Sequence, residues 1–193
     1  MHDEEYTLPS AKLIQAELKR ERNRRRFWKI IKNTISTLII IAAIAVLITT
    51  LVLPVLQIAG TSMEPTLNNS DIVVLLKISK LDYGDLCGFS YSNKILIKRV
   101  IAMPGDTIVM DESGNVYVNG EMIDEPYVTD KGLGECDIEF PFTVPENTYF
   151  LMGDHRTTSI DSRSSVIGCI PMEQIVGKLF IRVWPLSDME ILY

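Results

Sequence analysis

The sequence predicts a mainly β protein in which a single membrane-spanning helix precedes an all-β sandwich or folded barrel. Two observations lead to this fold class. No charged residue lies between Lys32 and Glu64, and branched aliphatic residues, alanine and threonine fill that window. After it come short runs rich in Ile, Val, Phe and Tyr, separated by turn signals such as "YGD", "SNK", "PGD" and "NG". The 193 residues are enough for one ordinary domain and an appendage.

The uncharged window is long enough to cross a bilayer. A helix from Ile35 to Leu56 would be roughly 33 Å long, which matches the hydrocarbon thickness of a membrane. A cleaved secretory signal is the alternative, but its apolar region has only about 7 to 15 residues and ends in a small-x-small site. Position −3 from Ala59 is Gln57, which does not fit such a site. We therefore assign residues 34–58 to a transmembrane helix.

Charge is distributed unevenly on the two sides of this window. Residues 1–33 carry nine Lys and Arg against five Asp and Glu, whereas residues 59–193 carry ten against twenty. Short basic flanks stay in the cytoplasm, so residues 1–33 are predicted to be a basic cytoplasmic segment and residues 59–193 an extracytoplasmic domain. The stretch "KRERNRRRFWK" could contact nucleic acid, but its place beside the span favours anionic lipid headgroups. We predict a lipid bilayer and no nucleic acid as partner.

Seven strands are predicted in the outer segment from their apolar and β-branched residues. Their close spacing suits a sandwich or folded barrel. Residues 129–147 have the weakest periodicity and are predicted to be an exposed excursion. The predicted strands are residues 71–79, 85–92, 94–103, 107–111, 115–120, 148–153 and 176–184.

The cysteines and histidines give no sign of a metal site. Cys87, Cys136 and Cys169 are odd in number, so they cannot all pair with one another. We interpret them as three unpaired packing residues, with one disulfide as the alternative. None has metal-ligand spacing, and His2 and His155 are the only histidines, so neither a metal nor a cofactor is expected.

A serine stands directly after the predicted span, in "QIAGTSMEPTLNNSDIVVLLK". Ser62 could be a cap, a turn residue or a nucleophile, and a nucleophile needs a base within hydrogen-bond reach. Histidine is the usual base. His2 precedes the span and is expected on the other side of the membrane, which leaves His155 as the only histidine candidate.

A neutral lysine is the other base that can serve a serine. Lys98 lies in "ILIKRVIAMPGD", and Leu96 and Val100 on the same strand face are apolar. Moving a lysine pKa from about 10.4 to near 7 requires roughly 4 to 5 kcal/mol of desolvation, which an apolar strand can supply. By itself this signal is weak, because a lysine in a strand more often extends into solvent.

Four stretches, taken together, resemble a known family. "GTSMEPTL", "YGDLCGF", "KRVIAMPGD" and "GDHRTTSIDSR" have the order and wording of the type I signal peptidases, which are membrane-bound serine proteases with a Ser-Lys dyad. The resemblance implies that Ser62 is the nucleophile and Lys98 its general base. It further implies that Ser159 orients the lysine amine and that Asp161 and Arg163 form an ion pair that braces the site.

Two positions depart from the family pattern. Gly60 stands where many Gram-negative members have a serine that donates to the oxyanion, whereas glycine is common in Gram-positive members. His155 replaces the asparagine of the usual "GDNR" wording, close to the centre of the motif. The short body also resembles the Gram-positive type.

An ion pair between Asp154 and Arg99 is a further expectation.

The resemblance implies a bacterial endopeptidase of the plasma membrane, with its amino terminus inside and its catalytic domain outside. It would remove the signal peptides of secreted preproteins, near the secretion translocon, without a metal or cofactor. Alternatives within the family are a dedicated pilin-processing enzyme and a non-catalytic pilus-assembly protein. Self-cleaving Ser-Lys repressors share the dyad, but they are soluble and the span argues against them.

The substrate is expected to bind as an extended strand, with small residues at positions −1 and −3. These two side chains would lie on the same side of the strand pleat. We predict that Met63 and Leu67 crowd the −1 pocket and that Ile97 contributes to the −3 pocket. The alternative is that all three are ordinary core residues.

Overall fold

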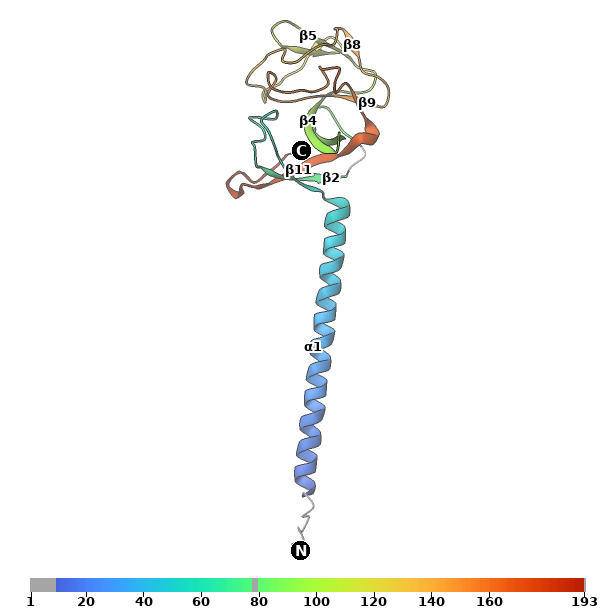
Figure 1. Cartoon of the computed structure of the whole chain (residues 1–193), viewed down its shortest axis with the longest axis vertical. Helices are drawn as coiled ribbons and strands as arrows, with labels where there is room; N and C mark the ends of the chain where they lie inside the picture. Colours follow the sequence, from blue (N-terminus) through green and yellow to red (C-terminus); the bar gives the residue numbers. More distant parts are fainter. Residues whose placement is uncertain (1–9, 78–79, 193) are drawn as a thin grey trace. The chain divides into compact units, whose positions relative to one another are not determined.

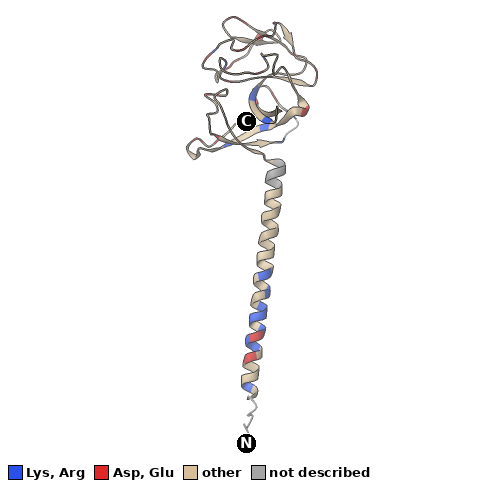
Figure 2. Cartoon of the chain, in the orientation of Figure 1, with Lys and Arg blue, Asp and Glu red and all other residues tan. Residues whose placement is uncertain are grey.

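The computed structural model describes residues 10–77 and 80–192, and the chain divides into two units, Met1–Thr49 and Thr50–Tyr193 (Figure 1). Helix α1 (Ala11–Val52) contains no glycine or proline along its 42 residues. Its stretch Ala11–Leu47 includes a segment long and apolar enough to cross a membrane, and none of that segment is buried. Figure 2 shows Lys and Arg in the amino-terminal part of the helix, followed by an uncharged stretch. The helix therefore fits a transmembrane anchor.

The helix does not coincide with the predicted span, 34–58: it extends beyond residue 34 on the amino side and ends before residue 58. The helix begins at Ala11 and continues through the basic segment, because Lys, Arg, Glu and Ala are good helix formers. It ends at Val52, because Pro54 has no backbone N–H and disfavours a helical backbone at the residue before it. Strand β1 (Val55–Gln57) follows and pairs with β2 (Ile72–Leu76).

The second unit contains two antiparallel sheets, as the sandwich or folded-barrel prediction requires. The larger has the order β1-β2-β11-β3-β4-β9-β10, with β12 beside β11, and the smaller has the order β7-β6-β5-β8. Figure 1 shows β2, β4, β9 and β11 in the larger sheet and β5 and β8 in the smaller. The other bounds are β2 (Ile72–Leu76), β3 (Leu86–Tyr91), β4 (Lys94–Ala102), β5 (Thr107–Met110), β6 (Val116–Val118), β7 (Glu121–Met122), β8 (Phe142–Thr143), β9 (Thr148–Met152), β10 (Ile170–Pro171), β11 (Ile175–Trp184) and β12 (Glu190–Ile191), with short 3₁₀ turns at Met172–Gln174 and Leu186–Asp188.

All seven predicted strands are confirmed, as β2, β3, β4, β5, β6, β9 and β11, although residues 78–79 of the first lie outside the described residues. The five other strands have two or three residues each, too few for a periodic pattern. The excursion 129–147 is mostly exposed as predicted, but it includes β8 and the buried Val144. Cys87, Cys136 and Cys169 are free thiols, which confirms the unpaired interpretation.

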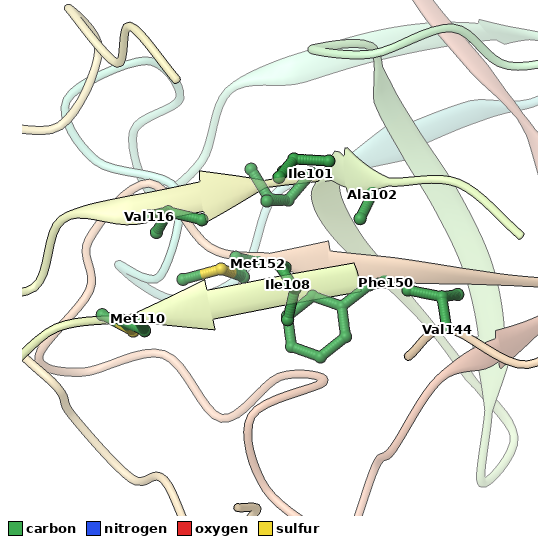
Figure 3. Packing of buried hydrophobic residues seen from close by; sticks show 9 residues of the cluster. Ile101, Ala102, Ile108, Met110, Val116, Val144, Phe150 and Met152 are labelled. Atoms are coloured by element: carbon green, nitrogen blue, oxygen red, sulfur yellow. The ribbon is translucent and has the colours of Figure 1, made fainter. Parts of the chain in front are cut away.

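A hydrophobic core joins the two sheets. Figure 3 shows its side chains from β4 and β9 of the larger sheet against those of β5 and β6 of the smaller. A second cluster packs Ile58, Met63 and Leu67 against β2, β3 and β11, and so supports the segment that carries Ser62. The labelled members of the first cluster are Ile101, Ala102, Ile108, Met110, Val116, Val144, Phe150 and Met152.

Strand β4 is paired on both sides along only part of its length. It pairs with β3 from Lys94 to Arg99, whereas its pairing with β9 begins at Arg99. Within the described residues, no strand pairs with segment 94–98 on the side where β9 pairs with the rest of β4, so this edge is free. Strand β1, at one end of this sheet, pairs with β2.

Candidate active site

Ser62 lies in the turn-rich segment between β1 and β2. Its segment is held by backbone hydrogen bonds: the N–H of Ile58 donates to Asp71 at 2.8 Å, and the carbonyl oxygen of Ser62 accepts from the His155 N–H at 3.1 Å. Gly60 has a φ of +104°, a conformation that L side chains rarely adopt, and its N–H donates to Asn69 Oδ1 at 3.0 Å. Glycine at position 60 therefore suits the local backbone.

Lys98 is buried within β4, and its side chain reaches Ser159. It is 4 % exposed, and its Nζ donates to Ser159 Oγ at 2.9 Å. Burial lowers the pKa of Lys98 from 10.5 to about 8. Among nearby charges, Asp161 and Asp154 act to raise this pKa, and Arg163 acts to lower it. A substantial fraction of Lys98 is thus neutral near pH 8.

Ser62 and Lys98 line the same groove, which has a volume of about 580 Å³. One wall comes from residues 56–63 and the other from residues 93–98, the part of β4 with the free edge. The groove is lined by apolar side chains such as Ile58, Ile95 and Leu96. The tertiary structure therefore brings together two residues that are 36 positions apart in the sequence.

Asp161 and Arg163 form the expected ion pair. Both side chains are fully buried, with Arg163 Nε donating to Asp161 Oδ1 at 2.8 Å and Nη2 donating to Oδ2 at 2.9 Å. Burial acts to raise the pKa of Asp161, but the hydrogen bonds and charge of Arg163 outweigh it, and that pKa is lowered. The carboxylate also accepts from the Gly153 N–H at 2.9 Å. Asp161 is thus ionised and braces the backbone next to Ser159.

The expected ion pair between Asp154 and Arg99 is also present. Arg99 Nε and Nη2 donate to the two oxygens of Asp154 at 2.8 and 2.6 Å. Thr66, four residues after Ser62, donates its hydroxyl to the same carboxylate at 2.5 Å. Successive side chains of a strand point to opposite faces, so Arg99 lies on the face opposite Lys98. Its guanidinium lies 3.8 Å from the ring centroid of Tyr127.

Two of the three predicted pocket residues line the groove. Met63 and Ile97 do so, whereas Leu67 does not. Leu67 is fully buried in the second core cluster, because a helical turn, in which its N–H donates to the Met63 carbonyl at 2.9 Å, directs it inward. Leu67 therefore lies behind the groove wall, and its predicted contact with the −1 side chain has no support from its position. Asn93, Lys94, Ile95 and Leu96 line the groove and were not predicted, since spacing cannot show which strand edge is left open.

His155 contributes to the site through its backbone. Its N–H donates to the Ser62 carbonyl, and its own carbonyl accepts from the Ser159 N–H at 3.1 Å. Within the described part of the chain, its buried Nδ1 has no hydrogen-bond partner. His155 does not line the groove. His2, the other histidine, lies outside the described residues.

A groove lined by a serine and by a buried lysine of lowered pKa has the groups that a hydrolase with an activated serine requires. Comparison with known proteins identifies the family. The family described as "Signal peptidase, peptidase S26" matches residues 31–184, and the chain belongs to it. This confirms the resemblance seen in the sequence and makes the chain a peptidase of signal peptide processing.

Several relatives are similar over most of their length. A probable signal peptidase I-2 of Synechocystis is 33% identical over 186 residues, which cover 90% of this chain and 81% of the relative. Signal peptidase I S of Bacillus subtilis is 32% identical over 165 residues, covering 79% and 89%. The crystal structure of a signal peptidase I from Enterococcus faecalis is 26% identical with a TM-score of 0.44, covering 52% of this chain and 97% of that one.

Proposed function

We propose that this chain is a membrane-bound serine endopeptidase that removes N-terminal signal peptides from exported proteins with a Ser62–Lys98 dyad. The observation that carries the proposal is the environment of Lys98. Its amine is buried, has a pKa of about 8 and shares a groove with Ser62. A general base works best when its pKa lies near the operating pH.

In the proposed reaction, neutral Lys98 accepts the hydroxyl proton of Ser62 while Oγ attacks the scissile carbonyl carbon. The tetrahedral intermediate collapses when Lys98 returns that proton to the leaving amine, which releases the mature protein and leaves the signal peptide as an ester on Ser62. Lys98 then removes a proton from water, which hydrolyses the ester. Ser159 orients the Lys98 amine by accepting a hydrogen bond from it.

We assign the backbone N–H of Ser62 as an oxyanion donor. The N–H of Gly60 is unsuited to this task because it already donates to Asn69. The substrate would add its backbone to the free edge of β4, with Met63 and Ile97 limiting the size of the side chains at −1 and −3.

The activity is tested with the purified full chain in detergent. We expect cleavage of a preprotein signal peptide after its −1 residue and no cleavage by Ser62→Ala. A pilin-derived peptide assayed in parallel distinguishes a general enzyme from a dedicated pilin-processing one. No cleavage of either peptide by the folded wild-type chain would favour the non-catalytic pilus-assembly alternative.

We propose a single pass through the plasma membrane near the secretion translocon, with the amino terminus inside, because the basic residues lie on the amino-terminal side of the apolar stretch. Protease added to intact spheroplasts should cleave after Ile58, and a reporter fused after Tyr193 should behave as exported. A carboxyl terminus protected from the protease would contradict this orientation.

A further inference from the structure

Residues 125–137 lie against the loop 153–165 that carries Ser159. The hydroxyl of Thr157 donates to Asp130 at 2.8 Å, and Arg163 Nη1 donates to the Leu133 carbonyl at 2.7 Å. The Asp137 N–H donates to the Arg163 carbonyl at 3.1 Å. Part of the excursion 129–147 thus contacts the loop whose Ser159 accepts the hydrogen bond of Lys98.

A further and deeply buried contact between these two segments is the ion pair of Glu125 with Arg156. Both side chains are 0% exposed, and the pairing is bidentate: Arg156 Nη1 donates to Oε2 at 3.1 Å and Nη2 donates to Oε1. A buried ion pair is weak evidence for stability, because the cost of desolvation offsets the attraction between the charges. We therefore expect this ion pair to matter less for stability than for the position of the group that Arg156 contacts.

Arg156 holds Gly153, the residue that separates the two serines of the site. Its Nε donates to the Gly153 carbonyl at 3.1 Å. A Cβ added at position 153 would collide with Ser159 Oγ and with the Ser62 carbonyl oxygen. The backbone at Gly153 therefore sets the spacing between Ser62 and the hydroxyl that accepts from Lys98.

A second link runs from the same segment to the neighbour of Gly153. The Tyr127 hydroxyl donates to Glu125 Oε1 at 3.3 Å, and the Tyr127 ring lies against the Arg99 guanidinium that holds Asp154. Residues 154 and 156, which follow Gly153, are thus both connected to the segment that begins at Glu125.

We propose that Glu125 is a positioning residue for the reaction of Ser62 and Lys98: its carboxylate fixes Arg156, which fixes the Gly153 backbone against both serines. This inference rests on the proposed function. Glu125 does not line the substrate groove, so its loss should slow the chemical step and leave substrate binding unchanged.

The test measures kcat and KM of the full chain in detergent on a signal peptide substrate. Glu125→Gln keeps the shape of the side chain and removes its charge. We expect a fall in kcat of about 100-fold, because a displacement on the order of 1 Å in a catalytic site has this effect, with KM within about twofold of wild type. Asp130→Asn is the matched control, since it alters an exposed contact of the same segment. It should leave both constants unchanged.

The folded fraction of each variant is measured by thermal unfolding. A wild-type kcat in Glu125→Gln, a loss no larger than the loss of folded protein, or a rise in KM alone would each overturn the inference. If Glu125→Gln is not recovered folded, Glu125→Asp retains the charge and withdraws it by one methylene. It should lower kcat on the order of tenfold, and a wild-type kcat would overturn the inference. Ser62→Ala in the same assay tests the proposed function separately: cleavage that persists there would contradict that function, whatever the result at Glu125.

Discussion

The two halves of strand β4 have opposite environments. From Lys94 to Ile97 the side chains are exposed or half-buried, line the groove and belong to a segment that pairs with β3 alone. From Val100 to Ala102 the side chains are at most 2% exposed, and β9 pairs on the other side. Lys98 lies at the boundary between the halves.

In the proposed reaction, this difference would let one strand bind the substrate and carry the base. An extended peptide needs free backbone groups at an edge, whereas a lysine base needs burial to lower its pKa. Placing Lys98 where the strand passes from its open edge into the core meets both requirements.

The largest effect is expected when the base is removed. Lys98→Ala should lower kcat/KM by at least about 10³-fold, because it removes both the proton acceptor and the partner of Ser159. Peptide cleavage by the purified chain measures the loss. His155→Asn should retain a substantial fraction of activity, since His155 contributes its backbone. Full activity in Lys98→Ala would show that another group is the base.

The second prediction concerns pH. Lys98 acts only when neutral, so kcat/KM should rise about tenfold per pH unit below its pKa of about 8 and level off above it. Burial is the main cause of the lowered pKa, so the rise should begin well below the range of an exposed lysine. A profile that stays flat from mildly acidic to alkaline pH, with chemistry limiting, would speak against a lysine base.

The third prediction concerns stability. Below pH 8, Lys98 is protonated in both folded and unfolded chains, and the folded chain bears the cost of burying the charge. Between pH 8 and 10.5 the unfolded chain binds more protons, so wild-type stability rises with pH. Lys98→Met should therefore stabilise the fold by about 1 to 3 kcal/mol at pH 7, a gain that disappears above pH 10.5.

Thermal unfolding of the full chain in detergent measures this gain. Lys94→Met, at the exposed end of the same strand, is the matched control and should leave stability unchanged. A gain in Lys98→Met that is independent of pH would mean that desolvation of the ammonium group is not its source.

The smallest effect is expected at the pocket. Ile97→Ala should relax the −3 preference toward larger aliphatic residues, because it removes overpacking worth about 1 to 3 kcal/mol, and should affect cleavage of an Ala-x-Ala peptide less. A peptide library varied at −3 measures the preference. An unchanged profile would reject Ile97 as a pocket wall.

Local patterns in the sequence were sufficient for the apolar helix, the seven longer strands and the turns between them, because periodicity and turn chemistry act over a few residues. The resemblance of four stretches added Ser62, Lys98 and the ion pair of Asp161 with Arg163 as candidates. The burial of the Leu67 side chain in the core was not predictable, because it depends on a single helical turn, which is too short to give a periodic pattern.

Only the tertiary structure decided how these parts act on one another. The lowered pKa of Lys98 depends on its burial in the folded domain, and the part of β4 that lines the groove is the part without a β9 partner in the described residues. The pairing of Glu125 with Arg156 joins residues 31 positions apart that no local pattern links. Burial and charge are sums over neighbours in space, and a linear sequence does not specify those neighbours until the chain has folded.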